Sequence, residues 1–261
     1  MKSNLQRLKF ESDANFKEMM SACWEAFENP FNSYLRIVYY LKDDSPQERE
    51  RSIQIATESA VRHHAKKSPN SYWMKVVEPT HGKLVGAANW VYFEGNSDTV
   101  NQSDPVVAVW WPEGIGREYA NNFMRQIDVH KYYLQCNRPY LLLNIAFTIP
   151  AFRRRGGMKL VMDWGISKAD ELGVDAYVEA TKTGRLLYEK YGFMTYYKVV
   201  VNTSIENPCA TWTNLETKLP PEPQYFMWRP IRGKFEVGKT WLPWGTEPFI
   251  PMRSYTYPGR H

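Results

Sequence analysis

Cysteine is scarce in this chain of 261 residues, which contains only Cys23, Cys136 and Cys209. An odd number of cysteines, with no paired motif and no zinc-ligand spacing, argues against a disulfide framework and against a structural metal site. Cys136 stands in a polar Gln-Cys-Asn context with no evident partner base, so we do not expect it to be a nucleophile. We therefore expect a reducing, cytoplasmic setting and no bound metal.

Long apolar runs and internal repeats are also missing. No segment approaches the roughly 20 apolar residues that span a bilayer, and residues 1–5 lack the apolar core of a signal peptide. No period typical of solenoids or propellers is present. We expect one domain over residues 1–231 that does not associate with membranes. It should carry an insertion at about 94–140 and be followed by a Pro- and aromatic-rich tail over residues 232–261.

Positively charged side chains outnumber negatively charged ones only slightly, which gives a formal net charge of +5. This excess favours anionic partners without distinguishing a polyphosphate cofactor from nucleic acid or a membrane surface. Aromatic residues, by contrast, make up 15% of the chain and include ten Trp and seventeen Tyr. Their broad flat surfaces can fill a core or line a pocket.

Apolar periodicity predicts most elements of the first half. Apolar residues at helical spacing behind Ser12 and Asp13, which can serve as caps, predict a helix over residues 16–27. Ser45, Pro46 and Glu48 form a helix-start pattern in which side chains satisfy free N–H groups, and that helix should end near residue 66. Residues 72–77 and 84–91 are expected to be strands of a hairpin, residues 94–105 a loop, and residues 113–135 an inserted helix.

A strand, a turn and a helix follow one another after residue 140. The apolar run 140–149 predicts a strand buried on both faces and ended by Pro150, while residues 159–172 carry one apolar side and stop at Gly173. The remaining elements are expected to be a strand over 175–181, a short helix over 186–191 closed by Gly192, and strands over 194–201 and about 225–229.

The turn after that strand has the composition of an anion site. It reads Phe152-Arg153-Arg154-Arg155-Gly156-Gly157-Met158-Lys159. Three arginines, two residues without a β-carbon and the free N–H groups of a helix start converge there, as pyrophosphate binding requires. The turn lacks the Lys-Ser or Lys-Thr of a P-loop and the glycine spacing of the dinucleotide fingerprint. A solvated basic loop or a targeting patch is the alternative interpretation.

Together with Leu187-Tyr188-Glu189-Lys190-Tyr191-Gly192-Phe193, this turn resembles the GNAT superfamily of acyl-CoA-dependent N-acyltransferases. It is most similar to a fungal group with Arg-Arg-Arg-Gly near the start of the central helix. Residues 149–157 match the family's strand end and pyrophosphate loop, and the tyrosine segment matches its Leu-Tyr-x-x-x-Gly-Phe signature. Met158 stands where the family usually has Gly or Ala, and Thr181 where Asn is often found.

The resemblance implies an α/β fold with a mixed, splayed central sheet flanked by helices on both faces. It also implies direct transfer of an acetyl group from acetyl-CoA to a primary amine of a small molecule or peptide, with a homodimer left open. The residues implied to bind the pantetheine arm through their backbone are Ala146, Phe147 and Thr148. Those implied to bind the pyrophosphate are Arg153, Arg154, Arg155, Gly156, Gly157, Met158 and Lys159.

For catalysis, the resemblance implies that Tyr188 protonates the departing thiolate. Glu179, on the strand before the tyrosine helix, is the nearest acidic candidate for the general base, and His130 beside Asp128 is an alternative. The strand over 140–149 offers Asn144 as its one polar candidate besides Thr148. The aromatic candidates to line an acceptor pocket are Trp90, Trp110, Trp111 and Tyr119.

Two other functions stay open. A non-catalytic acyl-CoA sensor or scaffold would account for Met158 and for the missing acidic residue on the strand over 140–149. A nucleic-acid-binding module would use the arginine cluster and exposed aromatic residues. Because the same arginines precede a helix start, we favour the transferase and expect no nucleic-acid partner.

Overall fold

A seven-stranded sheet with the order β1-β2-β3-β4-β5-β7-β6 lies at the centre of the computed structural model, which describes residues 5–10, 12–95, 107–128 and 138–251. Neighbouring strands of this sheet pair antiparallel, except β4 with β5, which are parallel. The predicted mixed sheet is therefore confirmed. The strands are β1 (Gln6–Lys9), β2 (Ser71–Glu78), β3 (Lys83–Phe93), β4 (Tyr140–Thr148), β5 (Asp175–Ala180), β6 (Met194–Val199) and β7 (Gln224–Arg229).

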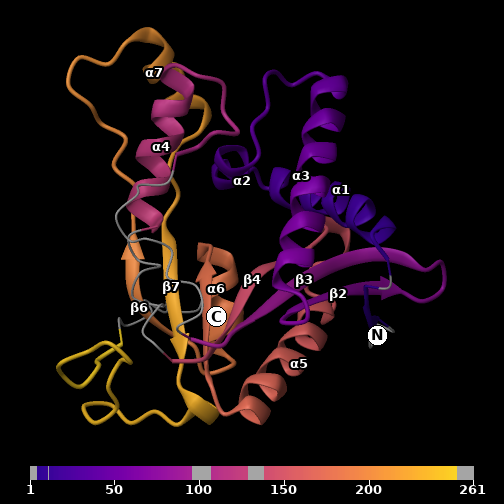
Figure 1. Cartoon of the computed structure of the whole chain (residues 1–261), viewed down its shortest axis with the longest axis vertical. Coiled ribbons are helices and arrows are strands. Elements are labelled where there is room, and N and C mark those ends of the chain that lie inside the picture. The colour runs from indigo at the N-terminus through magenta and orange to yellow at the C-terminus, as the bar shows by residue number, and fades with distance from the viewer. Residues whose placement is uncertain (1–4, 11, 96–106, 129–137, 252–261) are drawn as a thin grey trace, which may run out of the picture.

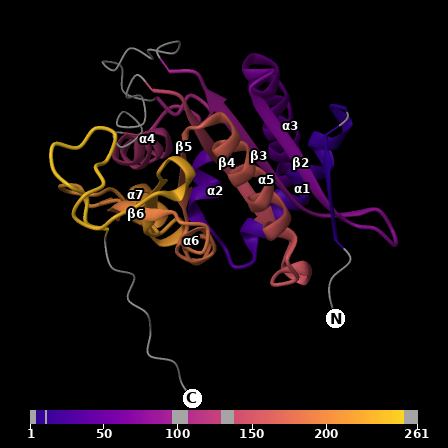
Figure 2. The same cartoon turned by 90° about the horizontal axis from the view of Figure 1, so that it is seen from below.

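Helices cover both faces of this sheet, as Figure 2 shows. One face is crossed by α5, which contacts β1 through β5, and α1 packs on β3 and β4 from the opposite face. Next to α1 lies α3, whereas α4 and α7 pack on each other beside β6 and β7. The helices are α1 (Ala14–Glu28), α2 (Ser33–Val38), α3 (Pro46–Lys67), α4 (Ile115–Asp128), α5 (Gly157–Leu172), α6 (Lys182–Glu189) and α7 (Ala210–Lys218).

The two halves of the sheet separate between β4 and β5. These strands pair only from Tyr140 with Asp175 to Leu143 with Val178, although β4 continues to Thr148. In Figure 1 the half with β2 to β4 runs to the right and the half with β6 and β7 stands upright at the left, with α6 between them. The predicted splay is confirmed, and it begins directly after Leu143.

A bulge in β4 lies at the start of the splay. On the β3 side, Trp90 pairs with Leu143 and Asn89 with Ile145, so Asn144 has no partner in the register. Leu143 packs in the core under α5, while Ile145 packs in the core under α1. The expectation that β4 is buried on both faces is correct up to Leu143 and wrong at Asn144, whose side chain is exposed.

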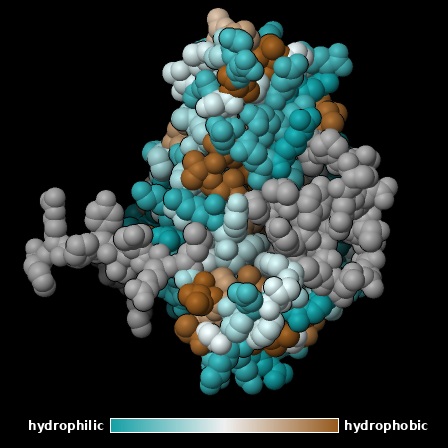
Figure 3. Space-filling view, turned by 90° about the vertical axis from the view of Figure 1, so that its left-hand side faces the viewer, coloured by the Kyte–Doolittle hydropathy of each residue, from teal (hydrophilic) through white to brown (hydrophobic). Residues whose placement is uncertain are grey.

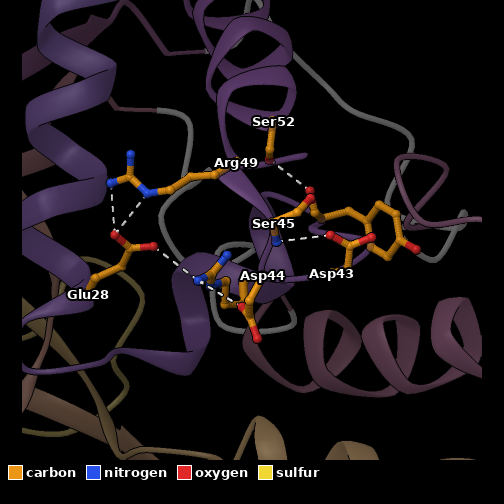
Figure 4. A network of polar contacts seen from close by, with 8 residues as sticks. Glu28, Asp43, Asp44, Ser45, Arg49 and Ser52 are labelled. Atoms are coloured by element: carbon orange, nitrogen blue, oxygen red, sulfur yellow. Dashed lines mark hydrogen bonds and ion pairs between the residues drawn. The ribbon is translucent and has the colours of Figure 1, made fainter. Parts of the chain in front are cut away.

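The N-terminal helices are tied together by one carboxylate. Glu28, at the end of α1, accepts hydrogen bonds from Arg36 of α2 at 3.0 Å and from Arg49 of α3 at 2.9 Å. Figure 4 shows Arg49 reaching across to Glu28. The Ser45 hydroxyl accepts from the Glu48 N–H, which confirms the predicted helix start. Asp13, predicted to cap α1, makes no side-chain cap hydrogen bond.

The C-terminal part differs from its prediction in two places. Thr181 does not end β5 but caps α6, accepting from the Gly184 N–H at 3.1 Å, so α6 begins four residues earlier than expected. The helix α7 lies between residues 201 and 225, where no element was predicted. The predicted tail packs through Phe235 and Phe249 against Trp228 of β7. Figure 3 shows the side with α4 and β6, where hydrophobic patches are small and separated by hydrophilic surface.

Candidate active site

The loop between β4 and α5 presents unpaired main-chain donors. After a short 3-10 turn over Pro150–Phe152, Arg154 and Gly156 adopt left-handed backbone conformations, with φ of 61° and 85°. Among the described residues, the N–H groups of Arg154, Gly156, Gly157 and Met158 meet no acceptor. A left-handed non-glycine residue at a helix start is uncommon and is often found at functional sites. The start of α5 therefore has the donors that an anion requires.

Gly157 and Met158 pack against the sheet as well as presenting main-chain N–H groups at the start of α5. Gly157 is buried, and a β-carbon at this position would lie 3.4 Å from Leu5 and from Val76. The Met158 side chain points toward the sheet, because its terminal methyl lies 3.3 Å from where a β-carbon of Gly86 would be. Met158, which stands where the family usually has Gly or Ala, therefore packs its side chain into the core. Its main-chain N–H stays at the start of α5 without an acceptor among the described residues.

The predicted cations of the loop divide into two groups. The Arg153 guanidinium donates to the main-chain oxygens of Thr148 at 3.2 Å and Ala26 at 2.6 Å, so it ties the loop to β4 and α1. Arg154 and Arg155 are exposed, and Arg155 lies over the Phe152 ring at 4.8 Å. These two are the arginines placed to reach an anion outside the loop.

Lys159 is the least available of the predicted anion-binding residues. Its ammonium forms an ion pair with Asp163 at 2.6 Å, one turn further along α5. Its N–H donates to the Gly156 carbonyl at 3.1 Å and is therefore not a free donor. The resemblance implies that the main-chain N–H of Lys159 binds the pyrophosphate, and in this structure that N–H has a protein acceptor.

The edge of β4 that faces the splay is open where the resemblance implies pantetheine binding. Ala146, Phe147 and Thr148 pair with β3 on one side and lie beyond the last residue that pairs with β5. Gly86 allows β3 to approach closely, since a β-carbon there would lie 2.6 Å from the Phe147 carbonyl oxygen. The Thr148 carbonyl already accepts from Arg153. The other main-chain groups of this edge that point away from β3 need partners, and an extended molecule with amide groups can supply them.

Tyr188 of α6 lies on the α5 side of the sheet. Its side chain is 7% exposed and packs in the core beneath α5, with its ring 6.0 Å from that of Phe193. Within the described part of the chain, its hydroxyl has no hydrogen-bond partner. Burial raises the pKa of Tyr188 to about 12, so the phenol stays protonated at neutral pH. The phenol is therefore available as a hydrogen-bond donor at neutral pH.

Glu179 lies on the opposite face. It follows Val178, the last residue of β5 that pairs with β4, and it pairs with Phe226 of β7. Phe226 packs toward α4 and α7, whereas Val178 packs toward α5 and Tyr188. Because side chains of a strand alternate between faces, Glu179 and Tyr188 flank the beginning of the splay from opposite sides.

The four aromatic candidates separate into two kinds. Trp110 and Trp111 both donate from their indole N–H to the Ile37 carbonyl, at 2.8 and 2.9 Å, and line a cavity of about 370 Å³ together with Tyr40. Tyr119 and Trp90 are wholly buried in the core. Cations outnumber anions in the cavity wall, where Lys42, Arg51 and Arg117 accompany Glu48.

Other expectations concern two residues of the segment 129–137, metal binding and membrane crossing. His130 and Cys136 lie outside the described residues. No group of three or more His, Cys, Asp or Glu side chains suited to a metal ion occurs in the described ranges. Over those same ranges, every helix is too short or too polar to cross a membrane.

Solved structures of similar fold cover most of the chain. At a TM-score of 0.54 and 13% identity, arylalkylamine N-acetyltransferase 2 from Aedes aegypti matches 88% of this chain and 99% of its own. A structure described as histone acetyltransferase HPA2 and related acetyltransferase, from Corynebacterium glutamicum, has a TM-score of 0.50 and 17% identity. The match covers 87% of this chain and 96% of that chain. The C-terminal condensation domain of Ebony, in complex with beta-alanyl-dopamine, has a TM-score of 0.52 and 10% identity. The match covers 87% of this chain and 99% of that domain. At these identities the likeness concerns the fold.

Sequence comparison adds a relative. No family model matches the chain. A probable acyltransferase SID5 from Ajellomyces capsulatus is 38% identical over 103 residues, which are 40% of this chain and 68% of the relative. The chain belongs to the GNAT acyltransferase family. In this GNAT protein, the sequence pattern did not predict the bulge at Asn144 or the hydrogen bonds of Arg153 to Thr148 and Ala26, because they depend on strand pairing and on contacts with distant segments.

Proposed function

We propose that this GNAT protein transfers an acetyl group from acetyl-CoA directly to a primary amine of a small molecule or peptide. The observation that carries the proposal is the gap between β4 and β5, which opens after Leu143 and Val178 and leads to the unpaired N–H groups at the start of α5. An extended thioester donor with amide groups at one end and a pyrophosphate at the other fits this combination.

The donor would be held by two kinds of group. The free N–H groups of Gly157 and Met158, with the exposed Arg154 and Arg155, would bind the pyrophosphate. The open edge of β4 over Ala146, Phe147 and Thr148 would bind the pantetheine amides. Acetyl-CoA, when bound, supplies the thioester that reacts.

The chemistry is a direct displacement at the thioester carbonyl. The neutral amine forms the new C–N bond, the C–S bond breaks, and the sulfur leaves as a thiolate. Glu179, on the α4 side of the gap, would accept the proton that the amine loses. Holding the amine beside the carbonyl makes the step effectively unimolecular.

Tyr188 stabilises the sulfur as a hydrogen-bond donor in this mechanism. Its pKa of about 12 exceeds the ~8.5 of a thiol by about 3.5 units, so full proton transfer would be uphill by roughly 5 kcal/mol. A hydrogen bond from the phenol to the developing thiolate avoids this cost, and the thiolate takes its proton from water. This refines the role of proton donor that the resemblance implies.

The acceptor would approach from the side of Glu179. The cavity lined by Tyr40, Trp110 and Trp111 offers aromatic walls. Both indoles bind the Ile37 carbonyl of α2, and the Ile37 side chain packs in the same cluster as Phe226 of β7. Two structural neighbours are named for arylalkylamines or were solved with beta-alanyl-dopamine. An acceptor panel should therefore include arylalkylamines beside aliphatic diamines and peptide amines.

Thiol release from acetyl-CoA, measured across this panel, tests the proposal. Thermal shifts with coenzyme A and with a form lacking the 3′-phosphate measure donor binding separately, and a ligand at a hundredfold its Kd adds about 2.7 kcal/mol. We expect donor binding and turnover of at least one amine. Binding without turnover of any amine would favour a sensor. Steeply salt-dependent oligonucleotide binding with indifference to coenzyme A would favour a nucleic-acid module.

A further inference from the structure

Asn144 is the first unpaired residue of β4, and its side chain is oriented by two buried groups. Its amide nitrogen donates to the Asn89 side-chain oxygen at 3.2 Å. Asn89 is 0% exposed and donates in turn to the Ser71 hydroxyl at 3.0 Å. Ser71 is itself buried, at 6% exposure. The exposed Asn144 is thus the outer end of a polar chain rooted inside the protein.

The hydrogen bonds from Asn144 to Asn89 and from Asn89 to Ser71 determine which end of the Asn144 amide faces outward. The Asn89 nitrogen also donates to the Trp90 carbonyl at 3.5 Å, and a carbonyl can only accept. The Asn89 oxygen is therefore the atom that faces Asn144, and Asn144 must meet it with its nitrogen. A side-chain amide whose nitrogen is held inward turns its carbonyl oxygen away from Asn89, and Asn144 is the exposed member of the pair.

The position of Asn144 places this oxygen at the gap. Asn144 follows Leu143 just as Glu179 follows Val178, and Leu143 with Val178 is the last pair between the strands. Leu143 and Val178 both pack toward α5. Asn144 and Glu179 therefore lie at the two edges of the beginning of the splay. Both project from the face opposite α5, because Asn144 reaches Asn89, whose neighbours Ala88 and Trp90 point to α5.

We propose that the side-chain oxygen of Asn144 accepts a hydrogen bond from the attacking amine and aims its lone pair at the thioester, with Asn89 and Ser71 as positioning residues. This inference rests on the proposed function. A primary amine carries two N–H groups, and Asn144 and Glu179 supply one acceptor each. An uncharged oxygen stabilises the developing positive charge without the strong preference for a protonated amine that a second carboxylate would create.

A matched pair of variants isolates that oxygen. Both Asn144→Asp and Asn144→Leu keep the size of the side chain, and neither can donate to the Asn89 oxygen at neutral pH. Only the Asp variant retains an acceptor. We expect Asn144→Leu to lower kcat/KM for the amine by about 10–100-fold, as for loss of a charge-assisted hydrogen bond. Asn144→Asp should lower kcat/KM less than Asn144→Leu when both are measured at a pH where most of the amine is neutral, so that the carboxylate's preference for a protonated amine does not mask its role as an acceptor. The KM for acetyl-CoA and the thermal shift with coenzyme A should remain unchanged in both.

Controls separate this inference from the proposed function. Gln54→Ala removes an exposed side-chain amide that donates to Glu58 on α3 and should leave kinetics unchanged. Equal losses in the Asp and Leu variants would mean that Asn144 matters only through Asn89 and would overturn the inference while the transferase stands. A wild-type protein that binds coenzyme A and acetylates no amine would overturn both.

Discussion

Gly165 of α5 lies directly against the indole of Trp90 in β3. A β-carbon at position 165 would overlap two ring carbons of Trp90 and lie 2.6 Å from its indole nitrogen. Trp90 is 0% exposed and has no room to move away. The absence of one side chain therefore sets how closely the central helix approaches the sheet.

Replacing Gly165 by Ala should destabilise the protein. The substitution gains about 1 kcal/mol of helix propensity, but overpacking against a buried ring typically costs about 1–3 kcal/mol and occasionally more. We expect a net loss of about 1–2 kcal/mol in urea unfolding. Ser167→Ala, on the exposed side of the same helix, is the control and should be neutral or stabilising. Equal stability of the two variants would contradict the packing argument.

Asp170 of α5 should contribute more to stability than its neighbour Glu171. Asp170 binds both guanidinium nitrogens of Arg229, at 2.7 and 3.1 Å, and Arg229 is 6% exposed. Asp170→Asn leaves that cation without its counter-ion, and we expect a loss of about 2–3 kcal/mol, below the full value because Asp170 is partly exposed. Glu171→Gln breaks only the exposed pair with Lys168 and should change stability by less than about 0.5 kcal/mol.

Tyr188→Phe should slow acetyl transfer without abolishing it. The variant keeps the packed ring and loses the hydroxyl, so we expect kcat to fall about 10–100-fold with an unchanged thermal shift on adding coenzyme A. Because the pKa of Tyr188 is about 12, the wild-type profile should show no loss of this group's contribution as pH rises to 10. A basic limb below pH 10 that is present in wild type and absent in the variant would contradict that assignment.

The three arginines of the loop should behave differently when each is changed to Ala. Arg154→Ala and Arg155→Ala should each weaken coenzyme A binding by about 5–20-fold and leave the melting temperature unchanged, because both side chains are exposed. Arg153→Ala should instead lower the melting temperature, since it removes the donor to Thr148 and Ala26. Isothermal titration and thermal unfolding distinguish the two patterns. Equal binding losses with equal stability in all three would contradict the division.

Much of the central region could be predicted from the sequence because its signals are local. The apolar run of β4, Pro150 after it and Gly173 at the end of α5 each determine structure through their own backbone preferences. The splay and the placement of Tyr188 came from the family resemblance and not from periodicity. The fold that the resemblance implies is confirmed, whereas the roles of Tyr188 and Glu179 stay predictions.

The remaining features depend on contacts between distant residues. The strand β1 and the helix α2 span four and six residues, too few for a period to show, and β1 is specified by its pairing with β2. The bulge at Asn144 depends on the register with β3. Thr181 continues the alternation of β5, so its role as the cap of α6 could not be read from the strand pattern.

The short ladder between β4 and β5 has a consequence for how this enzyme diversifies. In the part of the chain that the structure describes, β4 pairs with β5 only from Tyr140 to Leu143, and α5 bridges the two halves through side chains. Substitutions beneath α5 can therefore change the opening angle while both halves keep their internal bonds. The width of the gap between β4 and β5 can thus vary between sequences while the fold is kept.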